Sequence, residues 1–193
     1  MKKYYYTLTF YTDWLCSSGL DSGVEADALP IKDVKGLPFV PGKTIKGLFR
    51  QAAEEISDAQ GGKFSEVVSR VFGIGDDVEK EGQSGSAFFS NATLPLQEAS
   101  EIVKNNLQQF LFRKISSTAI DNAGLVKEKT LRTVEVCIPV VLTGEIVFDG
   151  LNEEEKDLCE ELLKMIVKWV RCLGSWRNRG FGRCRFELVD GIK

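Results

Sequence analysis

The sequence of 193 residues contains no histidine. Histidine is the usual acid–base group near neutral pH and the commonest metal ligand. Its absence excludes Ser-His and Cys-His nucleophile pairs as well as histidine metal sites. The five cysteines are scattered, and no two form a Cys-x-x-Cys pair. Such a set argues against a disulfide framework or a cysteine zinc site and predicts reduced, mostly buried thiols.

The chain also lacks any apolar run near the roughly 20 residues that cross a bilayer. Its basic start continues into a strand-like stretch that Asp13 interrupts, which is not the pattern of a signal peptide. We therefore expect a cytoplasmic protein that makes no membrane contact. The formal net charge of -3 excludes a basic protein that coats DNA, so any nucleic-acid site must be a local basic patch.

Periodicity divides the chain into strands and helices. Alternating β-branched and aromatic residues predict strands at residues 3–14, 86–94, 131–148 and 182–188. Apolar spacings of three and four predict helices at 43–56, 64–72 and 99–112, and another that Asn152 caps and Gly174 ends. Residues 17–36 and 113–129 have no clear period and are predicted to be irregular, and 76–85 to be a surface loop.

The main elements follow the order strand, helix, strand, strand, helix, strand. This order predicts an α+β, ferredoxin-like βαββαβ domain, the pattern that also underlies the RNA-binding RRM sheet. We predict one domain over residues 1–193, with long insertions at roughly 15–40 and 107–133. A fold does not determine a function, so the candidate sites must supply it.

The first candidate site is residues 37–47, LPFVPGKTIKG, in which a loop ends at Pro41-Gly42 and a helix begins. Free backbone N–H groups and the helix dipole favour a phosphate at such a helix start, and Thr44 is placed to cap it. An ordinary helix start with solvated lysines is the alternative. A nucleotide-binding P-loop is excluded because its first glycine is missing. The candidate RNA ligands here are Lys43, Thr44, Lys46 and Arg50.

The second candidate site is residues 174–185, GSWRNRGFGRCR, which place four arginines within nine residues. Arginine forks match phosphate oxygens, aromatic rings stack on bases, and glycine lets a backbone approach RNA closely. A tight connection before a closing strand is the alternative, but four arginines in an acidic chain favour a nucleic-acid site. The candidate ligands are Trp176, Arg177, Arg179, Gly180, Phe181, Gly182 and Arg183.

Together these segments resemble motifs of the RAMP (repeat-associated mysterious protein) superfamily. Residues 37–47 are similar to its (L/I)P-x-(I/V)PG-(S/T)-S-(L/I)-KG segment, and residues 174–183 to its C-terminal G-x-x-x-R-G-x-G-R loop. Residues 84–89, SGSAFF, resemble the start of its central strand. The resemblance implies an RNA-binding subunit of a CRISPR effector complex, and it is greatest for the single-domain backbone subunits of type III complexes.

The resemblance also implies partners. Such subunits stack with copies of themselves and with other RAMP subunits along guide RNA, and they contact target RNA. It further implies a thumb-like hairpin over residues 113–135 that inserts between guide and target, although an ordinary surface excursion is the alternative. The candidate RNA ligands in this hairpin are Arg113 and Lys114, and the candidate apolar wedge is Ile115, Ile120 and Leu125.

Residues 27–33, DALPIKD, resemble the family stretch D-S-P-x-x-(R/K)-D. The match implies that Asp27 is the catalytic aspartate for target-RNA cleavage in the assembled complex. A lone carboxylate without histidine needs assistance, so we expect Mg²⁺ or another divalent cation held by Asp27 and RNA phosphates. A non-catalytic structural subunit is one alternative. A guide-processing endoribonuclease is another, although such enzymes commonly use histidine and two ferredoxin-like halves.

Overall fold

The computed structural model describes residues 1–17, 28–74, 83–119, 123–125 and 130–189. The elements follow in the order β1 (Lys2–Phe10), α1 (Gly42–Ala59), α2 (Ser65–Phe72), β2 (Gly73–Ile74), β3 (Gln83–Ser84), β4 (Ala87–Phe89), α3 (Leu96–Lys104), η1 (Gln108–Leu111), β5 (Phe112–Ser117), β6 (Arg132–Cys137), β7 (Val141–Phe148), α4 (Glu153–Trp169), η2 (Arg177–Arg179) and β8 (Cys184–Val189). Among the described helices, none combines the length and the apolar character that a membrane span requires.

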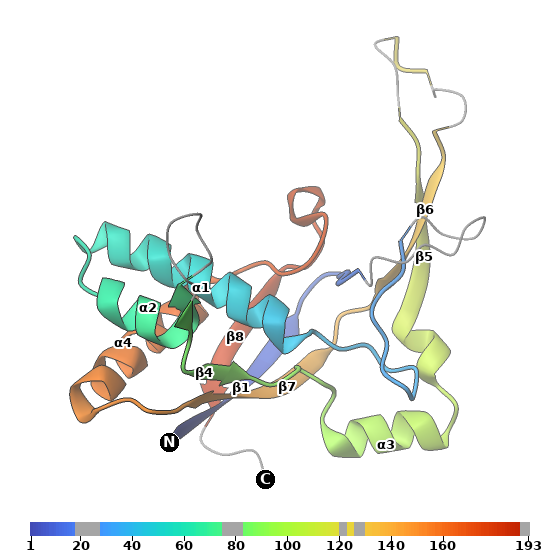
Figure 1. The fold of residues 1–193 in the computed structure, drawn as a ribbon. Helices are drawn as coiled ribbons and strands as arrows, with labels where there is room; N and C mark the ends of the chain where they lie inside the picture. The colour runs from blue at the N-terminus through green and yellow to red at the C-terminus, as the bar shows by residue number, and fades with distance from the viewer. Residues whose placement is uncertain (18–27, 75–82, 120–122, 126–129, 190–193) are drawn as a thin grey trace.

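Four antiparallel strands form the central sheet in the order β4-β7-β1-β8. Strand β1 lies in the middle, where Tyr6 is opposite Gly144 on one side and Leu188 on the other. Helix α1 follows β1, helix α4 joins β7 to β8, and both helices cover the same face of the sheet (Figure 1). This βαββαβ connection and strand order confirm the predicted α+β, ferredoxin-like fold.

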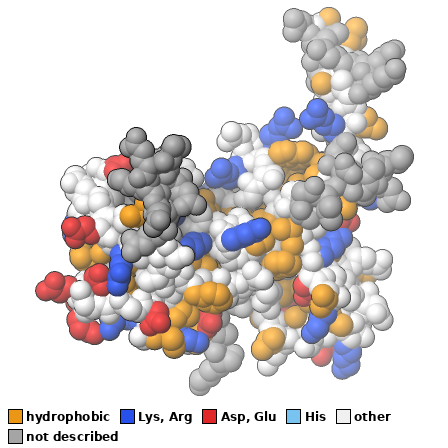
Figure 2. Space-filling model, in the orientation of Figure 1, with side chains coloured by type: hydrophobic (Ala, Val, Ile, Leu, Met, Phe, Trp, Pro, Cys, Tyr) orange, Lys and Arg blue, Asp and Glu red, His pale blue; other side chains and the backbone are white. Residues whose placement is uncertain are grey.

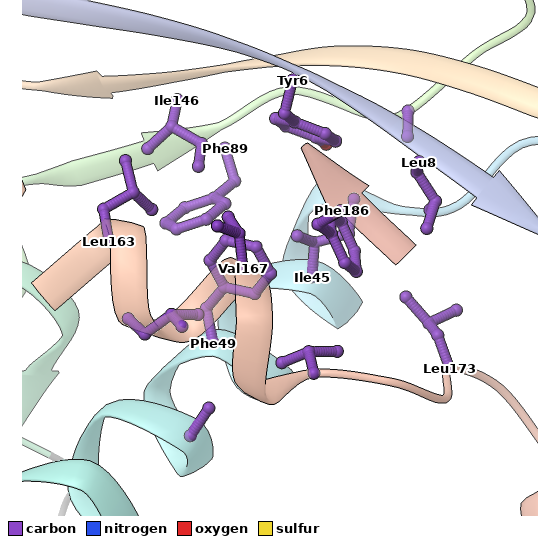
Figure 3. Close-up of a cluster of buried hydrophobic side chains, with 14 of the residues drawn as sticks. Tyr6, Leu8, Ile45, Phe49, Phe89, Ile146, Leu163, Val167, Leu173 and Phe186 are labelled. Atoms are coloured by element: carbon purple, nitrogen blue, oxygen red, sulfur yellow. The ribbon is translucent and has the colours of Figure 1, made fainter. Parts of the chain in front are cut away.

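The core lies between this face of the sheet and the helices (Figure 3). Phe49 of α1 packs edge-on against Phe89 of β4 and Phe186 of β8, with ring centroids 5.7 and 4.9 Å apart. Alternation along β1 places Tyr6 and Leu8 on the same face, where both are fully buried. The apolar period in the sequence therefore fixes which side of each strand faces the helices.

The cysteines are free, as predicted, and four of the five are buried. Burial raises the pKa of Cys16, Cys159 and Cys184 to about 12. These thiols are therefore neutral at physiological pH and are poor nucleophiles.

Several predicted strand boundaries are wrong. The predicted strand at 131–148 is two strands in different sheets, because β6 ends at Cys137 and β7 begins at Val141, with Pro139 between them. Proline has no N–H to donate to a strand ladder, so the chain turns there. The predicted strand at 86–94 is regular only over Ala87–Phe89, and that at 3–14 ends at Phe10. The segment predicted to be irregular at 113–129 begins as strand β5.

Two helix boundaries also differ. Helix α3 occupies Leu96–Lys104 rather than 99–112, and the separate turn η1 follows it. The predicted cap on α4 is confirmed, because Asn152 and Glu155 form a reciprocal capping box. That helix ends at Trp169 rather than at Gly174, since Val170 is already extended. The side chain of Trp169, the last residue of the helix, is 54% exposed.

Gly42 explains why α1 can begin against β4. A Cβ at this position would lie 2.1 Å from the carbonyl oxygen of Phe89, whereas a Cβ at Gly47 would meet nothing within 4 Å. We expect Gly42→Ala to lower the free energy of unfolding by about 1–3 kcal/mol because the strand must move. We expect Gly47→Ala to raise it by about 0.5–1 kcal/mol through helix propensity. Urea unfolding measures both variants, and equal midpoints would contradict this packing.

Candidate nucleic-acid interface

The start of α1 and residues 174–183, here called the glycine-rich loop, line one groove, although they lie far apart in the sequence. The groove has a volume of about 410 Å³, and Lys43, Thr44 and Gly47 of α1 line it. Ser175 and Arg177 line it from the loop. The fold therefore brings together Lys43, Thr44 and Arg177 from the two segments that the sequence singled out.

Side chains rather than backbone supply most of the positive character of this helix start. The N–H of Gly42 donates to Asn91 Oδ1 at 2.9 Å, and the N–H groups of Thr44 and Ile45 donate to the Pro41 carbonyl. Most donors of the first turn are thus already used. The predicted cap at Thr44 is wrong, because Pro41 occupies the N-cap position and no side chain caps the helix.

Lys46 and Arg50 do not line this groove. The ammonium of Lys46 donates to the Ala87 carbonyl of β4 at 2.9 Å. Burial, with a smaller contribution from the charge of Arg50, lowers the pKa of Lys46. The guanidinium of Arg50 pairs with Glu54 one turn along the helix, at 2.8 Å. Of the basic residues predicted on α1, only Lys43 presents its charge to the groove.

The glycine-rich loop has a fixed base. The N–H of Ser175 donates to the Leu15 carbonyl at 2.8 Å, and the N–H of Gly182 donates to the Asp13 carbonyl at 2.7 Å. Gly182 has a φ of +70°, and a Cβ there would lie 2.0 Å from the Leu173 carbonyl oxygen. Gly174 is similarly required by its φ of +99° and its approach to Leu15. Both glycines have structural roles whatever the loop binds.

The two aromatic residues of the loop pack against each other. The rings of Trp176 and Phe181 meet edge-to-face with centroids 5.6 Å apart. Both are partly buried against a small cluster of Leu15, Val134 and Val136. Each therefore has a structural partner, and base stacking is open only to the ring surface that stays exposed. The guanidinium of Arg179 lies 5.5 Å from the centroid of the Trp176 ring.

Strands β5 and β6 form a hairpin that projects from the body (Figure 1). The strand pairing of the hairpin expected from the resemblance is present in the described residues, whereas its insertion between guide and target stays a prediction. Arg113, at its base, pairs with the buried carboxylate of Asp13, while its own side chain remains 62% exposed. Arg113 and Arg179 line the same hollow of about 630 Å³. The side chain of Ile115 packs against the small cluster rather than projecting as a wedge.

The remaining predicted residues have different surroundings. Lys114 is exposed on β5. Gly180 has a φ of +84° and open space around its Cβ position, so a ligand can approach it. Arg183 lies elsewhere, in a hollow between the end of α4 and β8. That hollow also receives Lys168 and Arg171, which sequence reasoning missed because cations near a helix C-terminus have an ordinary structural explanation.

Asp27 lies outside the described residues, as does Ile120. Ala28, which follows Asp27 in the sequence, forms a bridge with Val134 of β6. Asp33 is held in a turn, where its Oδ1 accepts the N–H groups of Lys35 and Leu37 at 2.8 and 2.9 Å. Over the described ranges of the chain, no three acidic or cysteine side chains gather as a metal site.

Charge is distributed unevenly over the face seen in Figure 2. Lys and Arg side chains gather over the glycine-rich loop and the lower part of the hairpin, whereas most Asp and Glu side chains on this face lie over the helical end. Groove, loop and hairpin base thus form a local basic region on a chain of net charge -3. A region of this kind attracts a polyanion.

A sequence model of the RAMP superfamily matches residues 7–185. Among solved structures, the fold is similar to a chain of a type III-B Cmr-beta complex bound to cognate target RNA, with a TM-score of 0.72, 11% identity and 97% of each chain covered. The fold is also similar to a chain of the type III-B Cmr-beta complex in its apo state, with a TM-score of 0.72 and 13% identity; the match covers 99% of this chain and 98% of that one. For a chain of a type IV-B CRISPR complex the TM-score is 0.67 and the identity 12%, and the match covers 100% of this chain and 94% of that one. No curated protein matches in sequence.

Proposed function

Because the chain belongs to the RAMP superfamily, we propose that it is a guide-RNA-binding backbone subunit of a type III CRISPR effector complex. Its partners in this proposal are guide RNA, target RNA, copies of itself and other RAMP subunits. The solved structures with a similar fold come from type III-B and type IV-B complexes, which supports assembly into a ribonucleoprotein.

The groove between α1 and the glycine-rich loop is the observation that carries this proposal. Lys43 and Arg177 line it from segments that lie far apart in the sequence. Thr44 adds a hydroxyl, and Gly47 leaves the wall of α1 open to close approach by a sugar–phosphate backbone. The two cations suit contact with phosphate rather than recognition of a base.

Binding to RNA tests the proposal. We expect the chain to bind single-stranded RNAs of different sequence with affinities within a few-fold of one another, because backbone contacts carry no sequence information. We expect weaker binding to duplex DNA, whose phosphates lie on a rigid, wide rod that does not enter a groove of this size. Fluorescence anisotropy with four homopolymeric RNAs and one duplex DNA at fixed salt measures this. Tighter binding to the duplex would contradict the proposal.

Cleavage of target RNA is a second part of the proposal. Asp27 would hold Mg²⁺ or another divalent cation, and RNA phosphates would supply further oxygen ligands. The ion would stabilise charge on the phosphate during cleavage. Asp33 is less suited to this role, because its Oδ1 already accepts two N–H groups in a turn.

A non-catalytic backbone subunit is the main alternative. The Asp27 variant discussed below separates the two. A guide-processing endoribonuclease is less compatible with the chain, because the sequence has no histidine and the described residues form a single four-stranded ferredoxin-like sheet.

A further inference from the structure

A second basic surface lies beyond the groove that contains Lys43. The end of α4 and the edge strand β8 enclose a hollow of about 720 Å³. Four cations line it: Lys168 of α4, Arg171 just after α4, Arg183 just before β8 and Arg185 of β8. Of the residues described, none lines both this hollow and the Lys43 groove.

The positive charge of this surface is largely uncompensated. Glu187 is the one acidic residue among those described that lines the hollow, and it pairs with Arg185 at 2.9 Å. Within the described part of the chain, Lys168, Arg171 and Arg183 form no ion pair. Three neighbouring unpaired cations repel one another, and a polyanion removes that cost.

Tyr11 connects this surface to the hairpin. It lines both the hollow with Arg171 and the hollow that contains Arg113 and Arg179. Its N–H donates to the Arg183 carbonyl at 2.8 Å, which fixes its backbone, while its side chain is 53% exposed. An exposed aromatic ring between two sets of cations is the arrangement that single-stranded nucleic acids use for stacking.

We infer that this surface, formed by Tyr11, Lys168, Arg171, Arg183 and Arg185, binds a further stretch of single-stranded RNA. The cations would contact phosphates, and Tyr11 would stack on a base. The inference rests on the proposed RNA-binding function and extends the RNA contact past the glycine-rich loop to the sheet edge. It also gives Arg183 a role that its position outside the Lys43 groove otherwise leaves open.

An acidic protein segment added to the edge of β8 is the other class of occupant. The edge is already partly covered, because Cys172 bridges Arg183 and the N–H of Cys184 donates to the Arg171 carbonyl at 2.8 Å. Strand addition needs a run of free backbone groups, and this pairing shortens it. Cations on both sides of an exposed aromatic ring favour RNA.

The test is anisotropy with oligouridylates from about 4 to about 16 nucleotides, a range that spans the usual single-strand site sizes. Lys168→Ala/Arg171→Ala removes two cations from the surface. Lys104→Ala/Lys164→Ala removes the same charge elsewhere and serves as the matched control. We expect the first variant to bind the shortest RNAs as the wild type does and to lose the affinity gained with length. Its salt slope on the longest RNA should fall by about 1.4, or about 0.7 for each lost phosphate contact.

Tyr11 supplies an independent readout. Tyr11→Ala should weaken binding of the longer RNAs at least about fivefold, whereas Tyr11→Phe should bind them normally because it keeps the ring. The inference would be overturned if Lys168→Ala/Arg171→Ala and Tyr11→Ala both bound RNA of every length with wild-type affinity. The proposed function would survive that result if Lys43→Ala/Arg177→Ala still bound RNA more weakly than the wild type. Polyglutamate serves as a probe for an acidic protein segment. If Lys168→Ala/Arg171→Ala lost binding to polyglutamate but kept wild-type binding to RNA, the surface would be assigned to an acidic protein and the inference would be overturned. A wild-type chain that binds no RNA would overturn the proposed function itself.

Discussion

Replacing Lys43 and Arg177 together with alanine should reduce the affinity for single-stranded RNA roughly 100-fold. Both side chains line the groove between α1 and the glycine-rich loop. A hydrogen bond to a charged group contributes about 1.5 kcal/mol or more, so two lost phosphate contacts remove about 3 kcal/mol. The loss should be the same for every RNA sequence, and the salt slope should fall by about 1.4.

Anisotropy titrations at several salt concentrations measure this effect. The charge-matched control Lys104→Ala/Lys164→Ala should bind within about twofold of the wild type, since both lysines lie on outer helix surfaces in local ion pairs. Lys46→Ala/Arg50→Ala should lose less RNA affinity than Lys43→Ala/Arg177→Ala. The Lys46 ammonium already donates to the Ala87 carbonyl, and the Arg50 guanidinium pairs with Glu54. Unchanged affinity in a folded groove variant would remove the groove from the binding site.

Asp27→Ala should abolish guided cleavage of target RNA in the reconstituted complex. A metal-held carboxylate contributes several kcal/mol to such a reaction, so a fall of about 1000-fold or more is expected. Binding of guide and target should be retained, because in the proposal the cations of the groove hold the RNA and this carboxylate does not. Cleavage by the wild-type complex should likewise stop with chelator and return with Mg²⁺.

Neighbouring acidic residues provide the comparison for Asp27. Complexes that carry Asp21→Ala or Asp33→Asn should cleave target RNA normally. The asparagine in Asp33→Asn would keep an oxygen that accepts the N–H groups of the turn. Loss of cleavage in Asp21→Ala or Asp33→Asn with normal cleavage in Asp27→Ala would identify a different carboxylate. Normal cleavage in all three would make this subunit a non-catalytic scaffold.

The fold could be predicted from the sequence because its signals are local. Periods of two and of three to four identify most strands and helices, and their order specifies the ferredoxin-like connection. The break at Pro139 shows where this reasoning fails. A β-branched run on both sides of it reads as one strand, and only tertiary pairing reveals that β6 joins the hairpin while β7 joins the central sheet.

The candidate site could be predicted only in part. The sequence identifies which segments carry cations, and the structure shows that Lys43 and Arg177 line the same groove. The sequence does not identify the direction in which each side chain points. Lys46 lies three residues from Lys43 yet reaches β4, and Arg183 faces α4 rather than the groove. Trp176 and Phe181 resemble free stacking platforms in sequence, although they pack on Val134 and Val136 of the hairpin.

Photo-crosslinking locates the RNA on the chain. Single-stranded RNA containing 4-thiouridine would be bound, irradiated and digested, and the modified peptides would be identified by mass spectrometry. We predict crosslinks within residues 43–51 and 174–182, because these two segments line the groove. An RRM-like protein would instead bind RNA on the open face of its sheet, where Phe88 is 60% exposed. Crosslinks confined to that face, with none in the two groove segments, would contradict the proposed binding site.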